Sequence, residues 1–168
     1  MNSKKNVLPC IVLVGIVVGI LLKLFIIDIV KIGGESMLPT LQNNSYVFVS
    51  KIAYGIRNPF TNNYIITWKR PENTDIVLAL QDSKVIVKRV VAKENDTLDF
   101  CNNSLYSISV NTRTIPLTKE QYAFFAEFKT VPKAMLLLIG DNYEKSIDSR
   151  HYGFVAEESV LGKVVLWK

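Results

Sequence analysis

The chain has 168 residues, of which 49% are hydrophobic and 21% are charged, and this composition excludes a disordered or collagen-like polymer. Its net charge of +5 is unevenly divided, because residues 1–31 hold four of the 20 bases and one of the 15 acids, which leaves +2 for the rest. So small an excess excludes the basic surface of a nucleic-acid-binding protein.

The first predicted element is a transmembrane helix. Val7 to Leu22 contains no charged residue, and apolar residues resume after Lys23, which gives roughly 20 residues, enough to cross a bilayer core of ~30 Å. We expect an anchor over residues 7–28, a stub over residues 1–6 and an outer domain over residues 29–168. A cleaved secretory signal is the alternative, but the apolar run is longer than the usual ~7–15 residues and no small-x-small pattern follows it.

The charges beside this helix predict its orientation. Lys4 and Lys5 lie in a stub without acids, which favours a cytoplasmic stub and an outer domain on the extracytoplasmic side of the cell membrane, although Lys31 on the other side counts against it. A single-pass protein in contact with membrane lipid is therefore expected. Cys10 and Cys101 are too far apart in this layout to pair, and with one histidine the chain lacks zinc-site spacings, so we expect no disulfide, metal or cofactor.

The outer domain is predicted to be mainly β. Five segments are rich in Val, Ile, Leu and aromatic residues and are separated by turn formers: Tyr46–Ser50, Ile76–Leu80, Lys84–Val91, Leu136–Ile139 and Val160–Trp167. Short strands without an internal repeat predict one antiparallel β-sheet domain.

Two other segments of the outer domain carry distinct patterns. One helix is predicted over Lys119–Phe128, with Thr118 as N-cap and a core-facing aromatic stripe of Tyr122, Phe125 and Phe124. The apolar and aromatic segment Arg57–Arg70 predicts a hairpin, which either contacts the membrane interface or is an ordinary surface hairpin.

Ser36 is the candidate nucleophile, and a serine needs a base to remove its proton. The chain has one histidine, His151, but Ser36 lies in Gly33-Gly34-Glu35-Ser36-Met37-Leu38-Pro39, which is not the Gly-x-Ser-x-Gly turn of many serine hydrolases. His151 is expected at the surface. A base other than histidine is therefore needed.

Three segments together resemble a known family. Gly34-x-Ser36-Met37-x-Pro39-Thr40-Leu41 is similar to the nucleophile box of bacterial type I signal peptidases, Lys88-Arg89-Val90-Val91 to their general-base box, and Gly140-Asp141-Asn142-x-x-x-Ser146-x-Asp148-Ser149-Arg150-x-x-Gly153 to their last box. The three occur in the family's order behind a membrane anchor. The resemblance implies a serine peptidase that cleaves signal peptides from secreted preproteins, near the secretion machinery.

The resemblance also implies roles for single residues. Ser36 would be the nucleophile and Lys88 the general base, with Ser146 orienting the lysine amine and Asp148 and Arg150 bracing the site. At position 34, where some members have a serine that binds the oxyanion, a main-chain N–H near Gly34 would serve. Asp141 and Asn142 are expected to tie a turn beneath the site.

The residues around Lys88 favour such a role, because apolar neighbours lower the pKa of a lysine from its ordinary ~10.4. Alternation along the chain and likeness to the family predict shallow apolar pockets that accept alanine, lined by Ile32, Met37, Leu41, Ile86 and Val87.

The sequence leaves two alternative functions open. Self-cleaving repressors also combine a Ser-Met segment with a distant lysine, but they are soluble and have a DNA-binding helical domain in place of a membrane span. A catalytically inactive β domain that binds preproteins or other partners would be favoured if Ser36 and Lys88 lay far apart.

Overall fold

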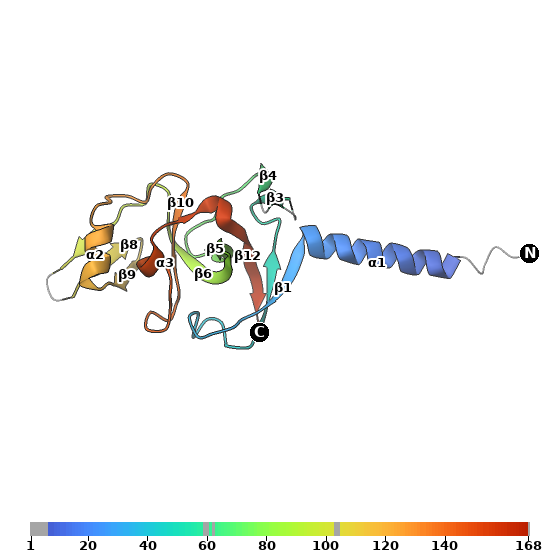
Figure 1. Cartoon of the computed structure of the whole chain (residues 1–168), viewed down its shortest axis with the longest axis horizontal. Coiled ribbons are helices and arrows are strands. Elements are labelled where there is room, and N and C mark those ends of the chain that lie inside the picture. Colours follow the sequence, from blue (N-terminus) through green and yellow to red (C-terminus); the bar gives the residue numbers. More distant parts are fainter. Residues whose placement is uncertain (1–6, 59–60, 62, 103–104, 168) are drawn as a thin grey trace, which may run out of the picture.

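The computed structural model describes residues 7–58, 61, 63–102 and 105–167 of the chain. A long helix, α1 (Val7–Phe25), projects from one end of a β domain that contains the other described elements (Figure 1). None of the α1 side chains is buried, and the mean hydropathy of the helix is 2.8. An apolar surface of this kind is stable when lipid covers it, so the protein is anchored in a membrane.

The β domain is built on a seven-stranded sheet in which every strand pair is antiparallel. Its order is β1 (Ile27–Lys31), β2 (Tyr46–Ser50), β12 (Val160–Trp167), β5 (Ile76–Gln81), β6 (Lys84–Lys93), β10 (Met135–Ile139) and β11 (Val155–Ala156). The prediction of a mainly antiparallel β domain behind an apolar helix is confirmed. β2 and β12 have the predicted bounds, and β5, β6 and β10 are one or two residues longer than predicted.

The helix ends three residues before the predicted boundary at residue 28, because residues 27–31 pair with β2 instead. Asp28 lies opposite Val49, and its carboxylate forms an ion pair of 3.1 Å with Lys51 Nζ. The same Nζ donates a hydrogen bond of 3.0 Å to the Lys23 carbonyl in the last turn of α1. Only Ile26 separates the helix from the sheet, so these contacts fasten α1 directly to the domain.

Alternation along the strands separates the core from the surface. In β2, Val47 and Val49 are fully buried, whereas Tyr46 and Phe48 are exposed. Two of the apolar clusters that the strands bury lie around Met37, Leu41 and Val47 and around Tyr54, Val77 and Leu138. The first of these clusters supports the loop that carries Ser36.

The predicted hairpin in Arg57–Arg70 is present as β3 (Gly55–Arg57) and β4 (Tyr64–Thr67), at the end of the domain from which α1 leaves (Figure 1). Ile65, Ile66 and Trp68 are more than half exposed. The Arg57 guanidinium donates hydrogen bonds to the carbonyls of Glu158 and Val160, which join the hairpin to the segment before β12.

The opposite end of the domain holds a three-stranded sheet of β7 (Asp99–Cys101), β8 (Ser107–Val110) and β9 (Arg113–Pro116), together with helix α2 (Lys119–Phe125). The Thr118 and Gln121 side chains form a capping box at the start of α2, as the predicted N-cap requires. The helix ends three residues before the predicted Phe128. Phe125 is buried and Tyr122 is partly buried, but Phe124 is 48% exposed, so the predicted core-facing stripe excludes it.

Candidate active site

Ser36 lies in the loop between β1 and β2, and the packing of its neighbours fixes that loop. Met37 and Leu41 are 1% exposed, and the Leu41 N–H donates to the Met37 carbonyl at 2.9 Å. Gly34 has a φ of 125°, in the region that favours glycine, and its N–H donates to Asn43 Oδ1 at 2.9 Å. The loop thereby holds the Ser36 side chain at a fixed position above the sheet.

Lys88 lies on β6, and its Nζ is 2.8 Å from Ser36 Oγ. The lysine is only 5% exposed, and burial lowers the pKa of its amine because the ammonium form loses its hydration. The Asp148 carboxylate opposes this shift, and the Arg150 guanidinium adds to it. An amine that loses its proton more easily than a free lysine can accept the proton of the adjacent hydroxyl.

Ser146 is buried next to this pair, without the hydrogen bond expected from its predicted role. Its Oγ forms no hydrogen bond with Lys88 Nζ in this structure, and the nearby Asp148 carboxyl has a pKa that the Ser146 hydroxyl helps to lower. A Cβ on Gly140 would lie 2.1 Å from Ser146 Oγ and 2.5 Å from the Ser36 carbonyl oxygen. Glycine at position 140 therefore allows Ser146 to pack against the Ser36 loop.

Asp148 and Arg150 form a buried ion pair beneath the site. Asp148 is 0% exposed and accepts from Arg150 Nε at 2.8 Å and from the Gly140 N–H at 3.0 Å. Burial alone would raise the pKa of this carboxyl, but the hydrogen bonds from Arg150 and Gly140 hold the pKa below its ordinary value. Arg150 also donates to the carbonyls of Tyr143 and Ser146, so the pair connects several parts of the loop before α3 (Ser149–Tyr152).

A second ion pair ties the Ser36 loop to β6, and sequence reasoning missed Thr40 and Arg89 as part of it. Arg89 Nε lies 2.8 Å from Asp141 Oδ1 and Arg89 Nη2 lies 2.6 Å from Oδ2, while Thr40 Oγ1 donates to Oδ2 at 2.6 Å. The Asn142 N–H donates to the Ser36 carbonyl at 3.0 Å. The sequence did carry a signal for this contact, because Thr40, Arg89 and Asp141 lie in the same three boxes as Ser36, Lys88 and Gly140.

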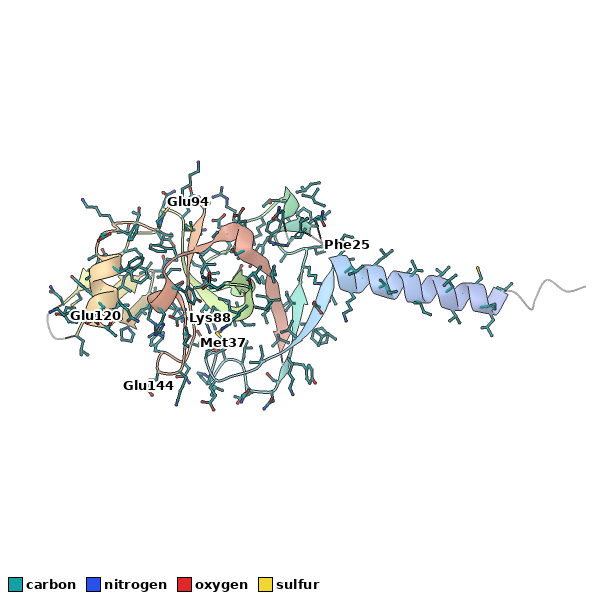
Figure 2. All side chains as sticks on the ribbon, in the orientation of Figure 1. Phe25, Met37, Lys88, Glu94, Glu120 and Glu144 are labelled. Atoms are coloured by element: carbon teal, nitrogen blue, oxygen red, sulfur yellow. The ribbon has the colours of Figure 1, made fainter. Side chains whose placement is uncertain are left out.

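A cavity of about 300 Å³ opens beside Ser36 and Lys88. Four of the predicted pocket residues line it: Ile32, Met37, Ile86 and Val87. Leu41 does not, which corrects the prediction, because it packs into the core with Val47 and Val49. Lys88 and Met37, which both line this cavity, are labelled in Figure 2.

The main-chain donors near Ser36 differ in availability. The Gly34 N–H is already bonded to Asn43 Oδ1, whereas the Ser36 N–H has no partner among the described residues. Ser36 rather than Gly34 therefore has the main-chain N–H that is free to bind an oxyanion.

His151 is exposed on α3, and its Nδ1 accepts from the Asp148 N–H at 3.4 Å as part of the cap of that helix. It lines another cavity, with Glu120 and Phe124, which does not include Ser36. The described residues also include no group of three or more His, Cys, Asp or Glu side chains that could hold a metal ion.

A serine hydroxyl in contact with a buried lysine amine is the arrangement of serine hydrolases that use lysine in place of histidine, here on a membrane-anchored β domain. Residues 4–167 match the family described as signal peptidase, peptidase S26. The chain belongs to this family and is a serine endopeptidase. The recognition of the family and the enzyme class is therefore confirmed, and the DNA-binding repressor class is excluded.

Known proteins of this family are similar to the chain over most of its length. A signal peptidase I of Buchnera aphidicola subsp. Baizongia pistaciae is 26% identical, with 90% of this chain and 73% of the relative covered. A signal peptidase I of Bacillus caldolyticus is 29% identical, with 90% and 84% covered. A crystal structure of a signal peptidase I from Enterococcus faecalis aligns with 59% of this chain and 100% of that chain at 22% identity and a TM-score of 0.43.

Proposed function

We propose that this protein removes N-terminal signal peptides from secreted preproteins, with Ser36 as nucleophile and Lys88 as general base. The observation that carries the proposal is the 2.8 Å distance between Ser36 Oγ and the Nζ of a lysine that is almost fully buried. The same contact disfavours the alternative function, a catalytically inactive β domain that binds preproteins.

The chemistry is acyl transfer in two steps. Neutral Lys88 Nζ takes the Ser36 proton as Oγ attacks the scissile carbonyl, and the Ser36 N–H donates to the oxyanion. The Lys88 ammonium then returns the proton to the departing amine as the peptide bond breaks. Water, deprotonated by Lys88, hydrolyses the acyl-enzyme and releases Ser36. A rotation of the buried Ser146 hydroxyl toward Nζ would orient the amine during these steps.

The preprotein binds as an added β-strand. β10 pairs with β6 only from Arg89 to Lys93, so the edge of Lys84–Lys88 has no partner strand among the described residues. An extended peptide on this edge presents alternate side chains to the apolar cavity beside Ser36. The apolar residues that line this cavity favour apolar side chains next to the scissile bond.

The protein is a single-pass protein of the cell membrane, with residues 1–6 in the cytoplasm and the β domain on the extracytoplasmic side. The basic stub with Lys4 and Lys5 supports this orientation. Lipid headgroups contact the exposed β3–β4 hairpin, and the secretion machinery that delivers preproteins lies nearby. Protease added to spheroplasts should digest the β domain and leave the stub intact; protection of the β domain would overturn this orientation.

The test of the chemistry uses the full chain in detergent with a purified preprotein, and the cleaved bond is located by mass spectrometry. Ser36→Ala, Lys88→Ala and Lys88→Arg should each abolish cleavage, the last because a guanidinium stays protonated. His151→Ala is the matched control and should retain most of the activity. Survival of activity in Lys88→Ala together with its loss in His151→Ala would assign the base to histidine.

A further inference from the structure

The cavity beside Ser36 has a neighbour on the side of α1. A second cavity of about 300 Å³ shares three lining residues with it: Val30, Leu78 and Val85. The other residues of this second cavity, here called the membrane-side cavity, are Leu24, Phe25, Asp28, Lys51, Arg57, Asn58 and Leu161. The two cavities are therefore neighbours: one lies beside Ser36, the other beside the last turn of α1, and Val30, Leu78 and Val85 border both. Here the pair of cavities is called the groove.

Two of the three charged side chains in the membrane-side cavity, Asp28 and Lys51, pair with each other. Lys51 pairs with Asp28 at 3.1 Å and donates to the Lys23 carbonyl. The Arg57 guanidinium donates to two main-chain carbonyls and lies 4.4 Å from the centre of the Tyr64 ring. Asp28 and Lys51 therefore compensate each other's charge, and carbonyls and the Tyr64 ring hold the Arg57 guanidinium. Most of the other lining side chains are apolar, which favours an apolar ligand.

The two ends of the groove lie where a preprotein must pass. Phe25 is the last residue of the apolar helix, and Figure 2 labels it at the junction between α1 and the β domain, so it marks the edge of the bilayer. A preprotein whose own hydrophobic segment spans the same bilayer leaves the lipid at that depth. Its chain must then run from there to Ser36 Oγ before it can be cleaved.

We propose that the membrane-side cavity binds the part of the preprotein between its hydrophobic segment and the scissile bond, and that Leu24 and Phe25 of α1 form one wall of this site. The proposal rests on the proposed function. The anchor then belongs to the substrate site as well as tethering the enzyme. An apolar side chain at the position that reaches this cavity should improve cleavage, in addition to the small residues required beside Ser36.

Disulfide cross-linking tests the path directly. The full-length protein in liposomes carries Ser36→Ala, so that substrate stays bound, together with Cys10→Ser, Cys101→Ser and one new cysteine. The preprotein carries a single cysteine, moved one position at a time from its hydrophobic segment to the scissile bond. Phe25→Cys should cross-link to positions near the hydrophobic segment, and Val87→Cys, in the cavity beside Ser36, to positions near the scissile bond.

Ile26→Cys is the matched control, because Ile26 follows Phe25 directly but does not line the cavity. Equal cross-linking of the preprotein to Ile26→Cys and to Phe25→Cys would overturn the inference. A disulfide between the Phe25→Cys residues of two enzyme molecules would also overturn it. Cross-linking at Val87→Cys alone would also overturn it while leaving the proposed function intact. No cross-link at either cavity would contradict both.

Kinetics provide a second measurement. In an otherwise active enzyme, Phe25→Ala should raise KM for a full preprotein by roughly tenfold, the effect of losing a small apolar contact, and leave kcat unchanged. A short peptide that includes only the residues next to the scissile bond does not reach the cavity, so its kcat/KM should not change. Equal losses for both substrates would indicate a general structural defect and overturn the inference.

Discussion

Lys88 combines two properties that conflict in most lysines: a position in the apolar interior and a contact with a hydroxyl. Burial destabilises the ammonium form, and the positive charge of Arg150 acts in the same direction. The buried Asp148 carboxylate acts against both, but its charge is compensated by Arg150 at 2.8 Å. The lysine therefore keeps a lowered pKa beside a carboxylate because that carboxylate is already paired.

This environment predicts the pH dependence of cleavage. The protonated amine has no lone pair, so activity is absent below the pKa of Lys88 and rises as the pH passes through it. Because that pKa is lowered, the midpoint of the kcat/KM profile should lie below the ~10.4 of a free lysine. The profile should be unchanged in His151→Ala. A midpoint at the value of a free lysine, or a profile that changes with His151, would contradict the role of Lys88.

The same burial predicts that Lys88 lowers stability. Replacing a buried amine by an apolar side chain of similar size removes the desolvation penalty, so Lys88→Met should raise the free energy of unfolding by about 1 kcal/mol and Tm by roughly 2–4 °C at neutral pH. Lys84→Met, at an exposed position of the same strand, is the control and should leave Tm unchanged. Thermal unfolding in detergent measures both. A fall in Tm for Lys88→Met would show that the amine stabilises the fold.

Among the structural elements, the Ser36 loop is held by contacts from two distant segments. Arg89 on β6 and Asp141 after β10 form a paired contact with two hydrogen bonds, and Thr40 of the loop donates to the same carboxylate. Burial alone would raise the pKa of Asp141, but the Arg89 and Thr40 hydrogen bonds hold it below its ordinary value. The stability from this carboxylate is present above its unfolded pKa of ~3.9 and is lost as the pH falls through the lower folded value.

Asp141→Asn should therefore destabilise the protein by about 3 kcal/mol, because Arg89 would be left partly buried without its charge partner. We also expect kcat to fall, since Thr40 and Asn142 fix the position of Ser36. Arg113→Gln is the control, because Arg113 is 36% exposed and lies 3.5 Å from the same carboxylate, so its loss should have little effect. Denaturant unfolding measures the loss of stability, and preprotein cleavage measures the loss of kcat. Equal losses in Asp141→Asn and Arg113→Gln would show that Arg89 is not the main partner of Asp141.

The β3–β4 hairpin is the element expected at the lipid surface. Trp68, Ile65 and Ile66 are exposed at the end of the domain that meets the last turn of α1, and tryptophan is favoured at the membrane interface. In the Trp167→Phe variant, Trp68 is the single tryptophan. When this variant is placed in lipid vesicles that contain bromine-labelled lipids, the lipids should quench the fluorescence of Trp68. The control replaces Trp68 by Phe and carries Leu105→Trp outside the hairpin. Equal quenching of both tryptophans would contradict contact through the hairpin.

At the scale of the whole molecule, the sequence predicted what depends on local pattern and missed what depends on pairing. β2 and β12 were predicted from their dense apolar residues. The first two residues of β1, Ile27 and Asp28, were assigned to the helix because their sequence suits either structure, and the pairing with β2 decides between them. β8 (Ser107–Val110) was missed because its serines alternate with only two apolar residues.

The candidate site divides in the same way. The motifs indicated that Ser36 and Lys88 come together, although the residues lie 52 positions apart, and the structure places their side-chain atoms in contact. The contact of Thr40 with Asp141 spans 101 positions and follows from how the loops meet, which no local pattern shows. Leu41 was assigned to the pocket by alternation, but the chain leaves the strand conformation after β1, so alternation no longer applies there.

The single residue between α1 and β1 limits how the domain can move relative to the bilayer. Ile26 is the whole connection, and Lys51 contacts both sides of it through the Lys23 carbonyl and Asp28. A domain on so short and braced a connection cannot swing on a flexible tether. The Ser36 hydroxyl is therefore held at one height above the membrane. We therefore expect the distance of a bond from the lipid to contribute to its selection, in addition to the side chains around it.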